Sequence, residues 1–185
     1  FAIFKGLEKV IINVDNFIIG QYSFKYCANL KEVVFENYLF KGIIESEAFS
    51  HCESLEDVTI NSRVIFDGDY IFWNCINLKN VYINYGYGEI PSYTFCYCEN
   101  LENINLHSGI TNIDPGAFYL CTSLEKLTVP AEIENLYVYY LYLNSLKSFE
   151  IDGESDFVYT VDGNLYAEFY DGKTYLLAYA SGKED

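Results

Sequence analysis

Several residue types are absent or scarce in this sequence. Its 185 residues include no methionine, one tryptophan and three prolines. Basic residues are also scarce, because eleven lysines and arginines stand against 27 aspartates and glutamates, which gives a formal charge of -16. A chain this acidic repels phosphate backbones and anionic lipid headgroups. The composition therefore argues against binding to nucleic acid or to membrane surfaces.

Long apolar stretches are missing as well. No run of about 18 apolar residues occurs, so we expect no membrane insertion within this segment. The first residues do not resemble a signal peptide. Because the chain begins at Phe1 and contains no methionine, we expect it to be a piece of a longer protein. Apolar residues nevertheless make up 51% of the chain, which predicts a folded core.

What the sequence does contain is a repeat. Each unit carries the pattern Phe-x-x-Cys-x-x-Leu, followed by two more apolar positions in alternation. The phenylalanines are Phe24, Phe49, Phe72, Phe95 and Phe118. The cysteines are Cys27, Cys52, Cys75, Cys98 and Cys121, separated by 25, 23, 23 and 23 residues. A fixed period of this length predicts a repeat architecture, in which each unit buries its apolar side chains against its neighbours.

Each unit has a segment of alternating polarity, such as residues 57–61, which predicts a short half-buried strand. Strands recurring at this interval pair in parallel with the next copy. The stretch around Phe-x-x-Cys is too short for a long helix and predicts one tight helical or 3₁₀ turn. Weaker copies flank the series, with Phe4, Leu7, Val10 and Ile12 before it and Tyr140, Leu143, Leu146, Phe149 and Ile151 after it. The count is about seven coils of ~23 residues.

These units resemble a known family. The string Ile-Asp-Pro-Gly-Ala-Phe-Tyr-Leu-Cys-Thr-Ser-Leu-Glu-Lys-Leu-Thr-Val-Pro at 113–130 resembles the BspA-like leucine-rich repeat, and the resemblance covers about residues 4–151. It implies a right-handed leucine-rich-repeat solenoid with short parallel strands on one face, helical or 3₁₀ turns opposite, and a concave outer surface over the strands. It also implies an extracellular or cell-surface location, since members are surface proteins of bacteria and protozoa.

We divide the chain into a solenoid over residues 1–151 and a C-terminal segment over 152–185. The C-terminal segment contains Asp-Gly steps at 162–163 and 171–172, which separate stretches rich in β-branched and aromatic residues. Asp-Gly between such stretches is a strong hairpin signal. We expect a small antiparallel hairpin or meander that caps or connects the repeats.

The adjacent pair His51–Cys52 could be read as a nucleophile with its base. Cys52, however, belongs to the cysteine series, whose counterparts in the flanking copies are Phe4 and Leu143. A place that accepts phenylalanine, leucine or cysteine requires an apolar side chain, so we interpret the series as core packing. Cys96 lies outside the series, and we expect it at or near the surface. We predict no enzyme activity.

Acidic turns at residues 67–69 and 152–156 invite a calcium interpretation, because hard cations bind clustered oxygen atoms. Neither turn matches a full loop signature, so solvated turns are the favoured interpretation. The repeated thiols lack the paired spacing of a zinc site. We predict no metal and no cofactor.

The outward residues of the predicted strands are the remaining candidates for function. We propose as a binding surface the set Glu32, Asp57, Thr59, Asn80, Tyr82, Asn103, Asn105 and Lys126. Amides, hydroxyls and an aromatic ring suit contact with a protein or a glycan, although ordinary solvation of a strand face explains them equally well. The first coil also presents an unprotected strand edge, which we expect to be covered by additional sequence in the full-length protein or by edge-mediated self-association of this chain.

The hypothesis from sequence is a non-enzymatic protein-binding or adhesion module of a larger secreted or cell-surface protein. Two alternatives stay open. The first is a purely structural repeat spacer without a specific ligand. The second is an accessory binding domain of a larger surface enzyme, whose catalytic segment would lie outside these residues.

Overall fold

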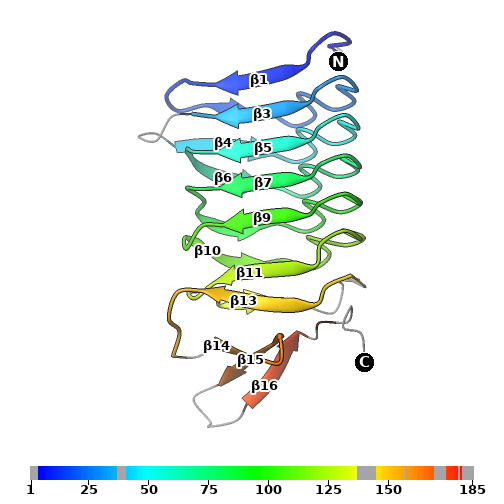
Figure 1. Cartoon of the computed structure of the whole chain (residues 1–185). Helices are drawn as coiled ribbons and strands as arrows, with labels where there is room; N and C mark the ends of the chain where they lie inside the picture. Colours follow the sequence, from blue (N-terminus) through cyan, green and yellow to red (C-terminus); the bar gives the residue numbers. More distant parts are fainter. Residues whose placement is uncertain are drawn as a thin grey trace.

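The computed structural model describes residues 4–36, 41–136, 145–156, 158–168, 174–178 and 180. The chain climbs as a solenoid, with each coil stacked on the one before it and an antiparallel sheet at the C-terminal end (Figure 1). The predicted solenoid of parallel strands with a C-terminal meander is confirmed. Tyr140, Leu143 and the second Asp-Gly step lie outside the described residues.

One face of the solenoid is built from the predicted strands. A five-stranded parallel sheet contains β1 (Lys9–Ile12), β3 (Glu32–Phe35), β5 (Asp57–Ile60), β7 (Asn80–Ile83) and β9 (Asn103–Leu106). Below it, β11 (Lys126–Pro130) pairs in parallel with β13 (Ser148–Asp152). The side chains alternate as the sequence predicts, because Val58 and Ile60 are buried while Asp57 and Thr59 face outward. We call the outward surface of these strands the front face.

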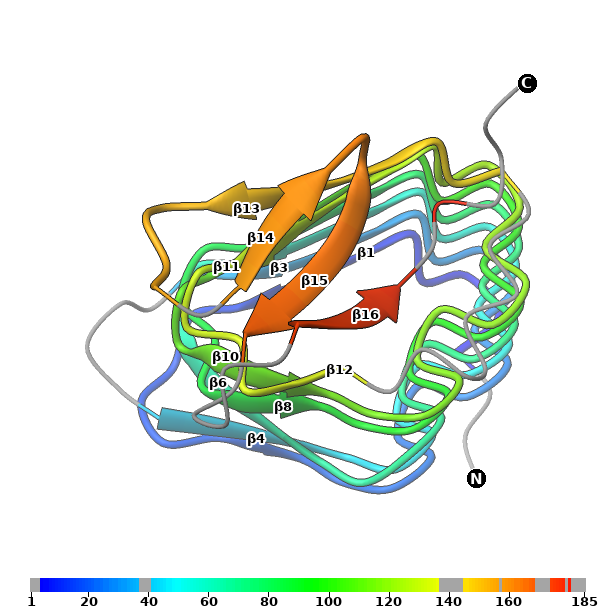
Figure 2. The ribbon, with the colours of Figure 1, turned by 90° about the horizontal axis from the view of Figure 1, so that it is seen from below.

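The opposite side of each coil carries a second short strand that the sequence analysis did not anticipate. One sheet contains β2 (Ile18–Ile19), β4 (Lys41–Glu45) and β6 (Arg63–Asp67). Another contains β8 (Gly88–Ile90), β10 (Ile110–Ile113) and β12 (Asn135–Leu136). Viewed along the axis, the two sides enclose the core, and the Phe-x-x-Cys turns close the coil at one edge (Figure 2).

These turns differ from the helical or 3₁₀ turn predicted from the sequence. Backbone N–H groups of Ser23, Lys25 and Cys27 bond to carbonyls three residues earlier, but the N–H of Phe24 bonds to the Ala48 carbonyl of the next coil at 2.8 Å. Tyr22 and Tyr26 have φ angles of 62° and 63°, which are left-handed and interrupt any helix. The turn side is therefore a third hydrogen-bonded ladder between coils, and no helix occurs in the described ranges.

The core is organised around the repeated phenylalanines. Phe49, Phe72, Phe95 and Phe118 are fully buried, whereas Phe24 is partly buried. Their rings stack face to face, with centroids 5.3 Å apart for Phe49–Phe72 and 5.5 Å apart for Phe72–Phe95. Successive rings contact one another from coil to coil, so the core consists of a continuous aromatic stack.

The cysteine series forms a second ladder beside these rings. Cys75 Sγ donates to the Phe49 carbonyl at 3.2 Å, and Cys98 Sγ donates to the Phe72 carbonyl at 3.3 Å. Cys52 and Cys121 make the same contact with the preceding coil. The cysteines thus supply a weak donor as well as apolar volume, which leucine or valine could not do. All the cysteines are free thiols.

The expectation that Cys96 lies near the surface is wrong. Its side chain is only 3% exposed. The counterparts of Cys96, such as Lys25 and Tyr119, are polar or long, so the column shows no apolar requirement. A small side chain at this place can turn inward, where a lysine or tyrosine reaches out to solvent.

The C-terminal sheet contains β14 (Val158–Val161), β15 (Asn164–Glu168) and β16 (Thr174–Ala178), in antiparallel order. Asp162 and Gly163 form the first turn with φ angles of 49° and 72°, as the Asp-Gly signal predicts. Leu165 is fully buried, and the Gly163 carbonyl accepts the Phe149 N–H at 2.7 Å. The sheet lies across the end of the solenoid and covers its last coil (Figure 2).

The aromatic stack yields a first prediction. Phe72→Ala should lower the free energy of unfolding by about 3–5 kcal/mol, because it removes a fully buried ring from the middle of the stack. Denaturant unfolding followed by circular dichroism measures the change. Phe4→Ala is the matched control, since that ring lies in the first described coil and is 48% exposed. Equal losses for the two variants would contradict the stack as the centre of stability.

Thiol reactivity gives a second prediction. Burial raises the pKa of Cys96 from 9.0 to about 12, and burial is also the main cause that raises the pKa of Cys98 and Cys121. The thiolate is the reactive form, so iodoacetamide at mildly alkaline pH should leave these thiols unmodified until the protein is unfolded. Mass spectrometry detects the adducts. Ser108→Cys adds an exposed thiol as a positive control, and alkylation of the folded wild-type chain at the same rate would refute the prediction.

The same pKa shifts have a consequence for stability. A group with a raised pKa in the folded state contributes stability that is fully present below its unfolded pKa. For Cys96 this stability is lost as the pH rises from 9.0 towards about 12. Unfolding midpoints measured across this alkaline range should fall less in Cys96→Ala than in the wild-type chain.

The strand edge gives a third prediction. In the described part of the chain β1 pairs only with β3, and Ile11 on its outward side is 52% exposed. We expect light scattering to show self-association that increases with protein concentration. Ile11→Lys should weaken this association, because charged side chains protect strand edges. Thr59→Lys, which lies two coils inside, should not. A strict monomer at every concentration would contradict the prediction.

Candidate functional site

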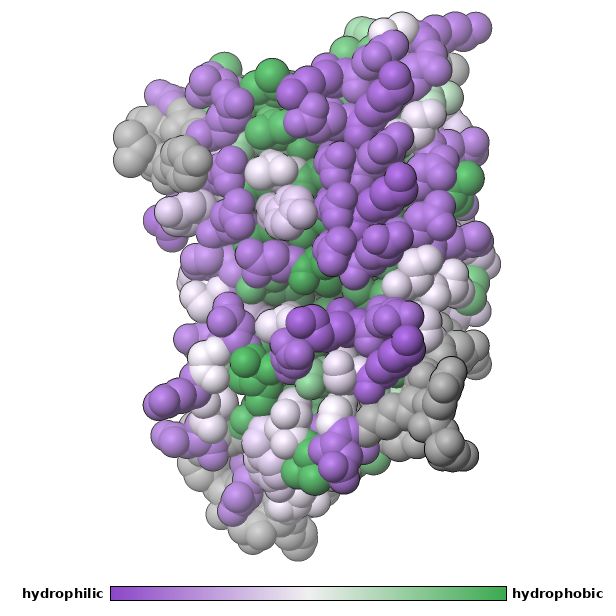
Figure 3. All heavy atoms as spheres, viewed as in Figure 1, coloured by the Kyte–Doolittle hydropathy of each residue, from purple (hydrophilic) through white to green (hydrophobic). Residues whose placement is uncertain are grey.

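Side chains of the front face stand in columns, because the parallel register places equivalent residues of successive coils side by side. The first column contains Lys9, Glu32, Asp57, Asn80 and Asn103. The second contains Ile11, Val34, Thr59, Tyr82 and Asn105. Hydrophilic side chains gather in a band over one half of this face, beside a column that is apolar at the N-terminal end (Figure 3). Most of the predicted binding residues are therefore neighbours.

The amides of the first column, however, already bond to one another. Asn80 Nδ2 donates to Asp57 Oδ1 at 2.7 Å, and Asn103 Nδ2 donates to Asn80 Oδ1 at 2.8 Å. The side-chain amide and carboxylate groups in the middle of the column therefore already have hydrogen-bond partners in the adjacent coils. Asp57 and Asn80 are thus bonded within the column, and Asn103 at its end keeps an amide oxygen that accepts no bond from a further asparagine.

The charged members of the set are also paired. Glu32 lies 2.7 Å from Lys9 Nζ, at the N-terminal end of the face. Lys126 Nζ lies 3.1 Å from Glu150 Oε2 in the following coil, so it is directed away from Asn103. Exposed pairs of this kind contribute little to stability. Because Glu32 and Lys126 are paired in this way, their charged groups are less available for contact with a ligand.

Tyr82 is the aromatic side chain that the front face presents to solvent at its centre. It is 41% exposed and lies between Thr59 and Asn105 in the register. Asn105 is exposed as well, and no side-chain hydrogen bond holds its amide within the described residues. A half-exposed ring next to an available amide is the strongest contact point among the predicted residues.

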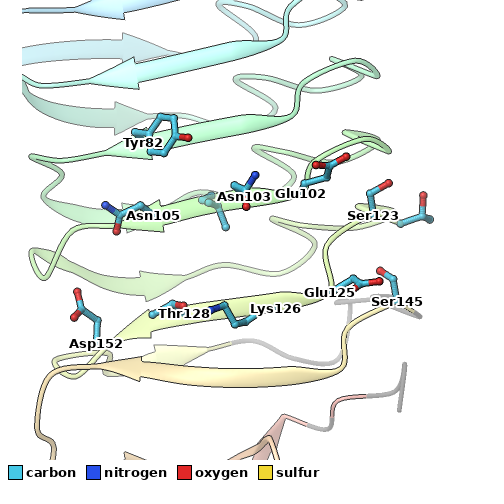
Figure 4. A pocket seen from close by; sticks show the side chains of 12 residues that line it. Tyr82, Glu102, Asn103, Asn105, Ser123, Glu125, Lys126, Thr128, Ser145 and Asp152 are labelled. Atoms are coloured by element: carbon cyan, nitrogen blue, oxygen red, sulfur yellow. The ribbon is translucent and has the colours of Figure 1, made fainter. Parts of the chain in front are cut away.

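The front face is interrupted directly below these residues. β9 ends the five-stranded sheet, and β11 lies next to it but pairs only with β13 within the described ranges. A groove of about 920 Å³ lies over this interruption. Its walls come from both sides, with Tyr82, Asn103 and Asn105 above and Lys126, Thr128 and Asp152 below (Figure 4). The inward-facing Ile104 also lines it, so the groove reaches between the strands.

Two features of the sequence coincide with the interruption. In earlier coils the residue after the strand donates its N–H to the coil above, as Asn61 does to Phe35 and Asn84 to Ile60. The equivalent residue in β11 is Pro130, which has no N–H to donate. At the other end of the strands, two glutamates, Glu102 and Glu125, occupy equivalent positions in adjacent coils, and like charges in this relation repel.

These glutamates belong to a charged column that precedes the strands. Its members are Glu8, Lys31, Glu56, Lys79, Glu102, Glu125 and Lys147. The charges alternate along the solenoid, and ion pairs join Lys31 to Glu8 at 3.1 Å and Lys147 to Glu125 at 2.8 Å. Within this column the alternation fails between Glu102 and Glu125, which both line the groove.

Sequence reasoning missed this side of the site. Glu102, Glu125, Thr128, Ser145 and Asp152 line the groove but were not predicted as binding residues. Two signals could have found them: the repeated acidic residue in an otherwise alternating column, and the proline that closes a strand. Tyr82, Asn103, Asn105 and Lys126 were predicted and do line the groove, whereas Glu32 and Asp57 lie outside it.

The pair His51–Cys52 does not form a catalytic arrangement. The His51 ring packs between Tyr26 and Trp73, with centroids 4.6 Å and 4.7 Å away, and its Nδ1 lies 3.1 Å from Asn74 Nδ2. Burial is the main cause that lowers the pKa of His51. Cys52 is fully buried and its thiol donates to the Phe24 carbonyl. The two side chains therefore point to different surroundings.

The described ranges contain neither the side-chain clusters of a metal site nor a membrane-spanning helix. His, Cys, Asp and Glu side chains nowhere gather there in a group of three or more that could hold a metal ion, and this includes the described acidic turns. In the same ranges no helix has the length and apolarity needed to cross a membrane.

Comparison with known proteins places the chain in a family. A model of the BspA type leucine rich repeat region matches residues 17–147 in 6 copies. A leucine rich cell surface protein from Faecalibacterium prausnitzii has a TM-score of 0.73 at 23% identity, over 96% of this chain and 51% of its own. The pneumococcal vaccine antigen PcpA has a TM-score of 0.57 at 20% identity, over 100% and 49%.

The chain spans about half the length of these two structures. At such identities the likeness concerns the fold. No curated protein matches the chain. Since the repeat model covers most of its length, the chain belongs to the family of BspA type leucine rich repeat proteins.

Proposed function

We propose that this chain is a non-enzymatic module of a larger secreted or cell-surface protein, and that it binds a protein partner on the front face. The observation that carries the proposal is the exposed Tyr82 ring at the rim of the groove between β9 and β11. A ring next to an available amide provides an anchor with hydrogen bonds around it, which is the pattern of binding hot spots.

The surface location is supported by the family and by one relative. The Faecalibacterium prausnitzii structure is that of a leucine rich cell surface protein. The buried thiols fit this location, because burial protects them in an oxidising environment. The absence of enzyme activity is supported by the buried cysteine series and by the packing of His51 between aromatic rings.

Binding by Tyr82 can be tested while the partner is still unidentified. The 185-residue chain is screened on protein and glycan arrays, and hits are measured by calorimetry. Tyr82→Ala should weaken binding ten-fold or more, from an anchor effect of about 2 kcal/mol, with little change in thermal stability. Tyr87→Ala is the control, since this ring is 60% exposed but does not line the groove.

The outcomes separate the alternatives. Equal binding by Tyr82→Ala and the wild-type chain would show that the partner contacts a surface other than the front face. A screen without any hit would favour a structural spacer. If only glycans bind specifically, the partner is a carbohydrate and the proposal of a protein partner is wrong.

A further inference from the structure

The groove between β9 and β11 contains a backbone acceptor whose equivalents in neighbouring coils are paired. The Lys79 carbonyl accepts the N–H groups of Glu102 and Asn103, at 3.1 Å and 3.0 Å. The Glu125 carbonyl accepts those of Lys147 and Ser148, at 2.7 Å and 3.3 Å. Among the residues that the structure describes, no backbone N–H donates to the Glu102 carbonyl. The interruption therefore leaves one strong acceptor open at the edge of β9.

A side-chain acceptor faces the same gap. In the first column each asparagine donates Nδ2 to the coil above and presents Oδ1 to the coil below. Asn103 is the last asparagine of this series, so its Oδ1 is presented towards β11. The residue that could bond to it there is Lys126, but Lys126 Nζ is paired with Glu150 at 3.1 Å.

The groove is lined by three carboxylates, Glu102, Glu125 and Asp152, and by one cation, Lys126, which is paired with Glu150. Glu102 has no ion pair in the described ranges, because Lys79 above it lies 3.9 Å from Glu56. Glu125 on the other side is acidic and pairs with Lys147. Glu102 and Asn103 both line the groove, and a carboxylate, a backbone carbonyl and an amide oxygen all accept hydrogen bonds.

A ligand for this set must donate several hydrogen bonds and carry positive charge. The arginine side chain presents five N–H donors in a fixed planar fork, and it bonds to carboxylates with two parallel bonds. A volume of about 920 Å³ exceeds what a single metal ion occupies and suits a peptide segment. The net charge of -16 attracts a basic partner over a longer range.

We propose that the groove between β9 and β11 binds an arginine side chain in an extended basic segment of the partner protein. The guanidinium group donates to the Glu102 carboxylate, to the Glu102 carbonyl and to Asn103 Oδ1, while the flanking backbone lies beside Tyr82 and Thr128. This proposal rests on the proposed function and specifies the chemistry of the partner.

The test uses two synthetic ten-residue Gly/Ser peptides that differ at one central position, arginine in one and citrulline in the other. Citrulline has nearly the same shape but no charge. ¹⁵N–¹H NMR of the full chain follows the backbone N–H signals of Glu125 and Lys126 and the side-chain amide of Asn103. The arginine peptide should move these signals at millimolar concentration and bind at least ten-fold more tightly than the citrulline peptide. Added salt should weaken the binding.

Two matched variants locate the effect. Glu102→Gln keeps the shape of the side chain and should weaken the arginine peptide ten-fold or more, with unfolding unchanged. Glu56→Gln removes the same charge from the same column, but there the carbonyl is already paired with Lys79 and Asn80, so binding should not change.

Several results would overturn the proposal. These are equal binding of the arginine and citrulline peptides, no shift at these amides at millimolar peptide, equal effects of the two variants, and shifts of the same amides by calcium chloride alone. Failure of this proposal can be told apart from failure of the proposed function. If Tyr82→Ala loses partner binding but the arginine peptide is not preferred over the citrulline peptide, the front face is supported as the binding surface and the arginine site in the groove is rejected.

Discussion

The register between successive coils is the constraint on which the rest of this structure depends. Parallel hydrogen bonds on the front sheet, on the opposite sheets and at the turns set each coil on the next with equivalent residues side by side. Strand spacing of about 4.8 Å then fixes the spacing of side chains. The stacked Phe72 and Phe95 rings and the bonded Asn80 and Asn103 amides are consequences of this one constraint. A repeated residue becomes a continuous ladder.

The same constraint explains why a departure from the repeat produces a local site. Pro130 has no N–H to donate to the coil above, whereas Asn61 and Asn84 at the equivalent place donate theirs. Glu102 would have a partner if a lysine followed it in the column, but it is followed by Glu125. Both departures fall between the coils of β9 and β11, where the sheet separates, while the core ladder continues through Phe95 and Phe118.

Much of the fold could be predicted from the sequence because the signal is repeated. The burial of Cys75 and Phe72 follows from the column that each belongs to, and the hairpin at Asp162–Gly163 follows from a turn that needs left-handed residues. Cys96 could not be placed in this way, since its column holds side chains of every kind. The left-handed Tyr22 was also missed, because tyrosine carries no local signal for a positive φ.

The groove was not predicted from the sequence, for a reason that concerns polar side chains in any stacked repeat. A column of amides on the outer face looks like a binding surface, but stacking lets each amide bond to the next, as Asn80 does to Asp57 and Asn84 does to Asn61. Exchanging such a bond for one with a ligand brings little net energy, since the bond within the stack is lost. Affinity is gained where the donor or acceptor series ends. In this chain that place is Asn103, beside the interrupted strands and the open Glu102 carbonyl, and this is why our proposal puts polar recognition at the interruption and not on the uninterrupted face above it.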